Sequence, residues 1–222
     1  MNFKRVFNHL SMLLLVLSCV LVMVSLYSGI ELWRGRSTEI FAAESLCLAA
    51  LLGLVGGGGL NLYSRGAEGT LGRREALLLV ALSWLLGAAL AAMPFWFWAM
   101  ISPRADAAHP FHNFVNCYFE SMSGLTTTGA TVLGNIEWLP HGMLLWRSLT
   151  HWLGGLGIVV LFVAVLPSLG VGGKRLYRIE APGPTPDGLS PQIKDTARAL
   201  WFIYLGLTLV EILALRLAGM PW

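Results

Sequence analysis

Hydrophobic residues along this chain fall into five long runs, and charged or polar segments separate each run from the next. A helix needs about 20 apolar residues to cross the roughly 30 Å hydrocarbon core of a bilayer, and the runs are of that order. The pattern therefore predicts an all-α fold with about five transmembrane helices, at residues 10–30, 42–63, 76–100, 144–169 and 200–217.

The first run follows Lys4 and Arg5, as the apolar region of a signal peptide would. Residues 10–30 contain no charge and are longer than the roughly 7–15 residues of such a region. No small-residue cleavage site is obvious. We therefore interpret this run as a first transmembrane helix.

Composition agrees with a polytopic membrane protein. Hydrophobic residues make up 56% of the 222 residues and charged residues 12%, with a mean hydropathy of +0.68. Soluble domains carry about 25% charged residues, so a soluble fold is excluded. The net charge of +3 is too small to indicate nucleic-acid binding. Cys19, Cys47 and Cys117 lie in apolar stretches without metal-ligand spacing and are expected to be unpaired thiols.

Basic residues orient the predicted spans. Ten of the 15 Lys and Arg residues precede the first span or fall in the segments between spans two and three and between spans four and five. Because cytoplasmic loops carry the excess of Lys and Arg, the N-terminus is predicted to be cytoplasmic. Five crossings would then place the C-terminus outside.

Residues 102–143 would lie outside, yet they are too apolar for a plain loop. Residues 113–123 predict a short helix that cannot span a bilayer. The economical arrangement is a re-entrant hairpin, in which this helix enters the membrane and an extended segment returns. The partly negative C-terminal end of such a helix favours a cation.

The returning segment begins with residues 124–131, of which six of eight are Thr or Gly. A polar backbone at membrane depth is tolerated only where protein buries it or where it lines a watery path. Ion-selectivity filters use such backbones, with carbonyl groups replacing the hydration shell of the ion. The alternative is an ordinary polar turn. Gly129 would accept a conformation that is costly for other residues.

Glu120 and Arg147 each lie in an apolar stretch. Because an ionisable residue at membrane depth usually has a partner, we predict that they pair behind the Thr/Gly segment. The alternative is that each meets backbone or water. His151 is expected to be a packing residue rather than a ligand. Glycines at 56–59 and at 154, 155 and 157 favour close helix contacts, and a gating hinge is the alternative for the second group.

Four segments resemble the bacterial Trk branch of the Trk/Ktr/HKT superfamily of potassium transporters: residues 119–131, 146–157, 166–173 and 177–184. The resemblance implies four helix–pore–helix repeats around one potassium path. It implies that Thr127, Thr128, Gly129, Ala130 and Thr131 form one strand of the filter, with K⁺ bound by Thr127 to Ala130. No other cofactor is expected.

On this resemblance, residues 1–70 form an N-terminal helix pair and 71–173 the first repeat. Residues 174–196 form a cytoplasmic loop, and 197–222 begin a second, incomplete repeat. One repeat supplies one side of a filter, so the chain is either a fragment or a shortened subunit that forms a homo-oligomer. It is not expected to conduct as a monomer.

The resemblance also implies a bacterial inner-membrane location and a cytosolic nucleotide-binding regulatory subunit as partner. The loop at 182–191 and its basic flanks could meet that subunit or anionic lipid. A membrane electron carrier that holds haem between histidines is the rival function. Of the five histidines, only His151 lies near a span interior, which disfavours it. No nucleophile–base pair is visible, so an enzyme is not expected.

Overall fold

The computed structural model describes residues 3–66, 72–165 and 189–220, and the side-chain surroundings of 3–66, 72, 74–157 and 198–220. These residues form helices and no strand. Two compact units, Met1–Trp152 and Leu153–Trp222, divide the chain within one helix. The long helices are α1 (Phe3–Trp33), α2 (Glu39–Ser64), α3 (Arg73–Ile101), α5 (His141–Val165) and α7 (Leu189–Leu217). The short ones are η1 (Pro110–His112), α4 (Phe114–Leu125) and η2 (Ile136–Trp138).

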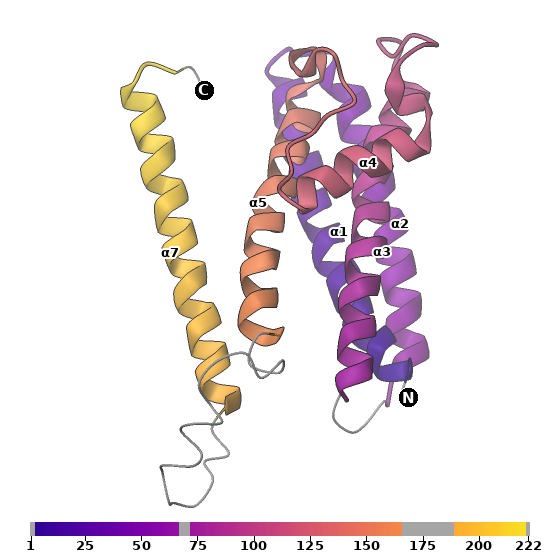
Figure 1. Ribbon diagram of the computed structural model, residues 1–222. Helices are drawn as coiled ribbons and strands as arrows, with labels where there is room; N and C mark the ends of the chain where they lie inside the picture. Colours follow the sequence, from indigo (N-terminus) through magenta and orange to yellow (C-terminus); the bar gives the residue numbers. More distant parts are fainter. Residues whose placement is uncertain (1–2, 67–71, 166–188, 221–222) are drawn as a thin grey trace, which may run out of the picture. The chain divides into compact units, whose positions relative to one another are not determined.

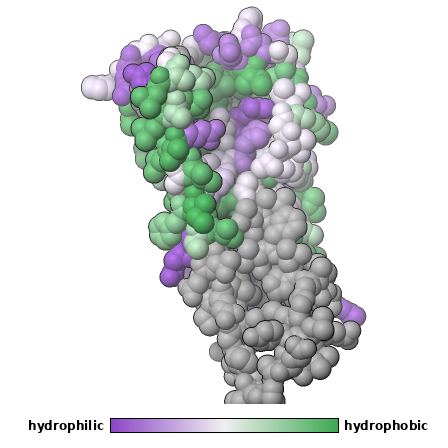
Figure 2. Space-filling view, turned by 60° about the vertical axis from the view of Figure 1, so that its left-hand side comes forward, coloured by the Kyte–Doolittle hydropathy of each residue, from purple (hydrophilic) through white to green (hydrophobic). Residues whose placement is uncertain are grey.

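The long helices agree with the predicted spans to within a few residues at most ends. Among the described residues, four helices are long and apolar enough to cross a membrane: α1, α2, α3 from Arg74, and α7 from Arg198. The fourth predicted span, 144–169, corresponds to α5. The last residues of this predicted span, 166–169, lie outside the described residues. The protein is thus an all-α polytopic membrane protein. Figure 2 shows a broad hydrophobic flank beside a hydrophilic end, as expected for a protein surrounded by lipid.

In the first unit, α1 and α2 form an antiparallel pair joined by a tight turn, and α3 packs beside them (Figure 1). The buried residues of α1 recur every three or four positions, which places them on one helix face. Small residues of α2 face this stripe. A Cβ at Gly53 would lie 2.1 Å from Ser18 Oγ and 2.8 Å from Leu90 Cδ2, so α1, α2 and α3 meet closely only because this side chain is absent.

The run of glycines at 56–59 remains helical, and its members differ in role. Gly57 faces α1, where a Cβ would lie 3.1 Å from Leu15 Cγ. Gly56, Gly58 and Gly59 face open space. Close packing therefore accounts for Gly53 and Gly57 and leaves the other three glycines without a packing reason.

The segment between α3 and α5 lies at the same end of the first unit as the turn between α1 and α2 (Figure 1). From there α4 runs obliquely back along α3, and the chain after α4 returns to that end. Aromatic contacts join α4 and its lead-in to α3: the Trp96 and Phe114 ring centroids are 5.9 Å apart, and those of Phe95 and Phe111 are 5.0 Å apart. A short helix followed by a returning segment is the arrangement that residues 102–143 were expected to adopt.

In the second unit, Gly155 of α5 lies against Tyr204 of α7, since a Cβ at Gly155 would be 2.7 Å from the tyrosine hydroxyl. A Cβ at Gly157 would meet open space. The close-packing interpretation of the glycines at 154, 155 and 157 thus has a specific contact at Gly155. The gating alternative stays untested.

Candidate functional site

The C-terminal end of α4 closes in a Schellman motif, in which two backbone amides turn back on the helix. Thr127 N donates to the Gly124 carbonyl at 2.8 Å, and Thr128 N donates to the Ser123 carbonyl at 2.9 Å. This geometry requires a left-handed residue at Thr127, whose φ is +57°. Glycine usually occupies that position, and a β-branched residue there is strained by about 1–2 kcal/mol. The chain therefore stores strain at the first residue of the predicted filter strand.

Positive φ recurs two residues later, at Gly129, where it is +77°. Thr126, Thr128 and Ala130 do not share it, so the sign of φ alternates from Thr126 to Ala130. In a β-strand, successive peptide groups point to opposite sides, whereas a backbone in which φ alternates in sign can turn successive carbonyls to one side. All the residues from 126 to 131 are exposed in this chain. The segment can therefore present a row of carbonyl oxygens. The expectation that Gly129 has a conformation costly for other residues is confirmed.

The carbonyl of Ala130 is an exception within this row. Ser123 Oγ on α4 donates to it at 2.7 Å, so at least one lone pair of this oxygen faces the helix. The Thr126 and Thr128 hydroxyls, 2.8 Å apart, hydrogen-bond to each other on the other side of Thr127. The segment is thus tied to α4 at both ends, whereas the carbonyls of Thr127, Thr128 and Gly129 accept no hydrogen bond from the described residues.

Glu120 joins α4, the returning segment and α5. Its Oε1 accepts from Arg147 Nε at 2.6 Å, while its Oε2 accepts from the Thr131 hydroxyl and from Val132 N, both at 3.0 Å. The Glu120 side chain is fully buried, and the Arg147 side chain is 15% exposed. The structure therefore brings together the two residues that were expected to pair. It adds that the same carboxylate also holds the backbone directly after the Thr/Gly segment.

Helix α5 is the support for this pair. Trp146 Nε1 donates to the Ala91 carbonyl of α3 at 3.0 Å, and Thr150 lies so close to α4 that a Cβ at Gly124 would be 2.2 Å from its hydroxyl oxygen. His151 Nδ1 is 2.9 Å from the Arg147 carbonyl one turn earlier. Both a packing residue and a ligand can make such a bond within a helix, so the packing role of His151 stays a prediction.

Glu39 is an acidic residue that the sequence did not single out, because it lies in the charged segment between the first two predicted spans. Glu39 is fully buried at the start of α2. Its Oε1 accepts from His141 N at 2.6 Å, and its Oε2 accepts from Gly142 N at 3.0 Å and from Ser28 Oγ at 2.7 Å. The sequence signals only that α5 lacks a side-chain cap of its own. Pro140 precedes α5, and proline cannot supply the side-chain cap that the first amides of a helix need.

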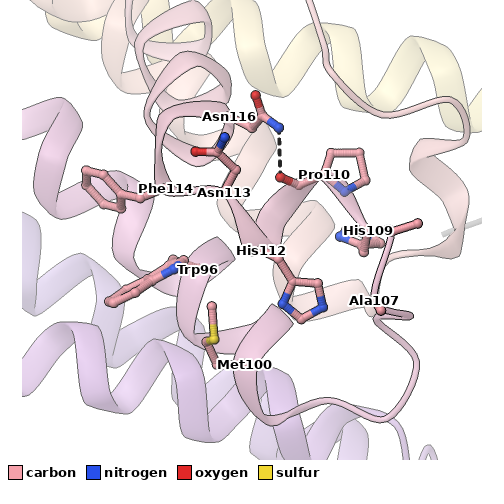
Figure 3. A pocket seen from close by; sticks show the side chains of 10 residues that line it. Trp96, Met100, Ala107, His109, Pro110, His112, Asn113, Phe114 and Asn116 are labelled. Carbon is pink, nitrogen blue, oxygen red and sulfur yellow. Dashed lines mark hydrogen bonds between the residues drawn. The ribbon is translucent and has the colours of Figure 1, made fainter.

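An open groove lies beside the N-terminal end of α4, between the end of α3 and the segment leading into α4 (Figure 3). His109 and His112 both line it. His109 Nδ1 accepts from Phe111 N at 3.2 Å, which requires an unprotonated nitrogen. Burial, and secondarily the neighbouring His112, lower the pKa of His109, while Asp106 acts in the opposite direction. His109 is therefore a local structural cap and not a free ligand.

The described cysteines are free thiols, in agreement with the expectation. Cys117 is buried on α4, and its Sγ lies 3.2 Å from the Phe111 carbonyl. Cys19 and Cys47 lie on the outer surface of α1 and α2.

These helices and the motif at the end of α4 define a polytopic membrane protein with a short helix and an exposed segment of alternating φ sign beside a buried ion pair. The TrkH family model, described as "Cation transport protein", matches residues 73–219. The chain therefore belongs to the TrkH family of cation transport proteins.

Individual relatives agree with this assignment. The "Trk system potassium uptake protein TrkH" of Salmonella typhimurium is 41% identical over 204 residues, covering 90% of this chain and 40% of that protein. The protein of the same description from Halomonas elongata is 39% identical over 228 residues, covering 100% of this chain and 43% of the relative. The chain spans about two fifths of the length of these curated relatives.

The fold has a solved counterpart. The crystal structure of the potassium transporter TrkH from Vibrio parahaemolyticus matches with a TM-score of 0.77 and 32% identity, covering 100% of this chain and 41% of that chain. The all-α membrane architecture therefore agrees with an experimental structure of the same family.

Proposed function

We propose that this chain forms one part of a potassium-uptake pore in the bacterial inner membrane. The exposed backbone of Thr127 to Ala130 would replace part of the hydration shell of K⁺, with the carbonyls of Thr127, Thr128 and Gly129 as the principal ligands. The observation that carries this proposal is the pair of hydrogen bonds that Glu120 accepts from Thr131 and Val132, since they hold an exposed, strained segment in one place. K⁺ is the proposed ion because the relatives are named potassium uptake proteins.

The role proposed for the segment is passive coordination rather than chemistry, so the protein would not be an enzyme. Inward movement would be driven by the membrane potential, which is worth about 2.3 kcal/mol per charge per 100 mV. The partly negative C-terminal end of α4 adds a favourable field for a cation beside the segment. Selectivity for K⁺ over Na⁺ would arise because the backbone held by Glu120 cannot contract freely around the smaller Na⁺ ion.

A carbonyl cage needs oxygen atoms from about four sides, and this segment supplies one. We propose that the other sides come from equivalent segments, either elsewhere in the same protein or in further copies of this chain. In this scheme α1 and α2 are the additional N-terminal pair, and α3, α4 and α5 form one helix–pore–helix unit. Helix α7 would then begin the next unit.

The scheme includes an orientation and a partner. The N-terminus would be cytoplasmic, since most basic residues outside the spans lie on that side. The end of the first unit that carries the turn between α1 and α2 and the segment before α5 would then face outward, where potassium enters. A cytosolic nucleotide-binding subunit would regulate the pore from the opposite side.

A growth test addresses the function directly. The longest reading frame that contains this sequence is expressed in a bacterium that lacks its own potassium-uptake systems. Growth at low potassium, together with rubidium uptake that excess K⁺ suppresses and Na⁺ does not, is the expected result. Absence of uptake by a protein shown to reach the membrane would contradict the proposal. Residues 1–222 alone, when monomeric, should not support growth.

The electron-carrier alternative gains nothing from the structure. His9 and His151 each bond Nδ1 to a backbone carbonyl one turn earlier, which any helical histidine can do, and the relatives are named potassium uptake proteins rather than haem carriers. No second function is proposed.

A further inference from the structure

The first turn of α5 obtains its cap from another helix. The first amides of any helix lack partners within it, and an Asp, Asn, Ser or Thr just before the helix usually accepts from them. Here Pro140 occupies that position. The buried carboxylate of Glu39, about a hundred residues earlier in the chain, accepts from the amides of His141 and Gly142 instead. Its negative charge also lies at the positive end of the α5 macrodipole.

Several contacts hold Glu39 in this position. Ser28 Oγ on α1 donates to the same carboxylate at 2.7 Å. The absence of a side chain at Gly142 makes the approach possible, because a Cβ there would lie 2.5 Å from Ser28 Oγ and 3.2 Å from Glu39 Oε2. The cap thus joins α1 and α2 to the start of α5 through the fully buried side chains of Ser28 and Glu39.

From this cap, a continuous series of contacts leads to the Thr/Gly segment. Arg147 lies six residues after His141, about 9 Å along a rigid helix. It donates to Glu120 at 2.6 Å, and Glu120 accepts from the Thr131 hydroxyl and Val132 N at 3.0 Å. N–H···O hydrogen bonds span about 2.7–3.2 Å, so a displacement of α5 by about 1 Å would lengthen the Arg147 contact beyond this range.

We propose that Glu39 is a positioning residue for ion selectivity: by capping α5, it sets the position of Arg147 and therefore of the Glu120-bound filter segment. This gives the N-terminal pair, α1 and α2, a direct role in the properties of the pore. The inference rests on the proposed function and extends it to a residue far from the ion.

The test compares Glu39→Gln with Glu137→Gln in the full-length protein. A glutamine side chain in place of Glu39 has one acceptor oxygen for two amides, and its NH₂ group would face a second N–H donor. Glu137 is an exposed carboxylate in the segment just before α5, so its replacement controls for the loss of one negative charge at the same end of the molecule. Rubidium uptake per membrane-inserted molecule is measured against K⁺ and Na⁺ competition, together with the apparent KM for K⁺.

We expect Glu39→Gln to lower the K⁺-over-Na⁺ ratio by at least about fivefold and to raise KM, whereas Glu137→Gln stays at the wild-type ratio. In an Arg147→Gln background, Glu39→Gln should cause little further change in selectivity, because the connection is already broken. A purely structural role would reduce the amount of protein and leave KM and selectivity per molecule unchanged. That outcome overturns the inference.

A second variant covers the case in which Glu39→Gln does not fold. Gly142→Ala keeps the carboxylate and suits a helix, but its methyl group pushes against Ser28 and Glu39. It should shift selectivity in the same direction, and wild-type selectivity in this variant would also overturn the inference. Failure of the wild-type protein to transport potassium would instead contradict the proposed function, so the two failures are distinguishable.

Discussion

Replacing Glu120 and Arg147 separately and together measures how strongly the two residues interact. Glu120→Gln keeps one oxygen, which can still accept from Thr131 and Val132, but its NH₂ group then faces the Arg147 guanidinium. Two donors oppose each other, and a mostly buried positive charge loses its partner. Arg147→Gln leaves the fully buried carboxylate with only its two neutral donors. Breaking one side of a buried pair costs about 3–5 kcal/mol in each case.

The double variant Glu120→Gln/Arg147→Gln removes both charges. The amide oxygen introduced at position 147 can accept from the NH₂ group introduced at position 120, so neither a buried charge nor an unpaired donor remains between them. We therefore expect the double variant to be less destabilised than the sum of the two single variants by about 2–3 kcal/mol, which corresponds to roughly 30- to 150-fold in the unfolding equilibrium.

The free energy of unfolding of the full-length protein is measured in mixed detergent micelles, with tryptophan fluorescence as the signal. Arg104→Gln and Glu137→Gln, both at exposed positions, form the control pair and should each change stability by less than about 0.5 kcal/mol. Additive effects of Glu120→Gln and Arg147→Gln, within about 0.5 kcal/mol, would refute the reasoning, since they would mean that the residues do not interact in the folded protein.

Backbone strain and membrane orientation give three further predictions. Gly129→Ser places a side chain on a residue whose φ is +77°, at a cost of about 1–2 kcal/mol, and should lower K⁺-over-Na⁺ selectivity as measured by competitive rubidium uptake. The control Gly134→Ser, at a position that is equally open but lacks a positive φ, should leave the selectivity unchanged. Thr127→Gly should raise the melting temperature by relieving strain of about 1 kcal/mol and should lower K⁺-over-Na⁺ selectivity. A lower melting temperature would show that Thr127 is unstrained. Arg104→Cys should react with an impermeant thiol reagent in whole cells and Lys194→Cys should not; the reverse would overturn the orientation.

The sequence by itself determined the helical membrane class. An uninterrupted apolar run of about 20 residues satisfies its own backbone hydrogen bonds in lipid as a helix, and this is why the spans agree with the helices α1, α2 and α3 to within a few residues at most ends. It also determined that Gly129 needs a permissive conformation, because a carbonyl-presenting backbone is a local property. The expected contact between Glu120 and Arg147 followed from burial, since two opposite charges in apolar surroundings have few other partners.

Only the tertiary structure decided which groups meet across long stretches of chain. Glu39 looks like a loop charge in the sequence, because nothing local shows that its carboxylate reaches amides about a hundred residues later. The glycines at 56–59 look alike, yet of these four only Gly57 faces another helix. The Ala130 carbonyl, expected to face an ion, accepts from Ser123 because the helix end brings that hydroxyl within 2.7 Å. Periodicity and composition report the environment of each residue, whereas its partner depends on how the helices pack against one another.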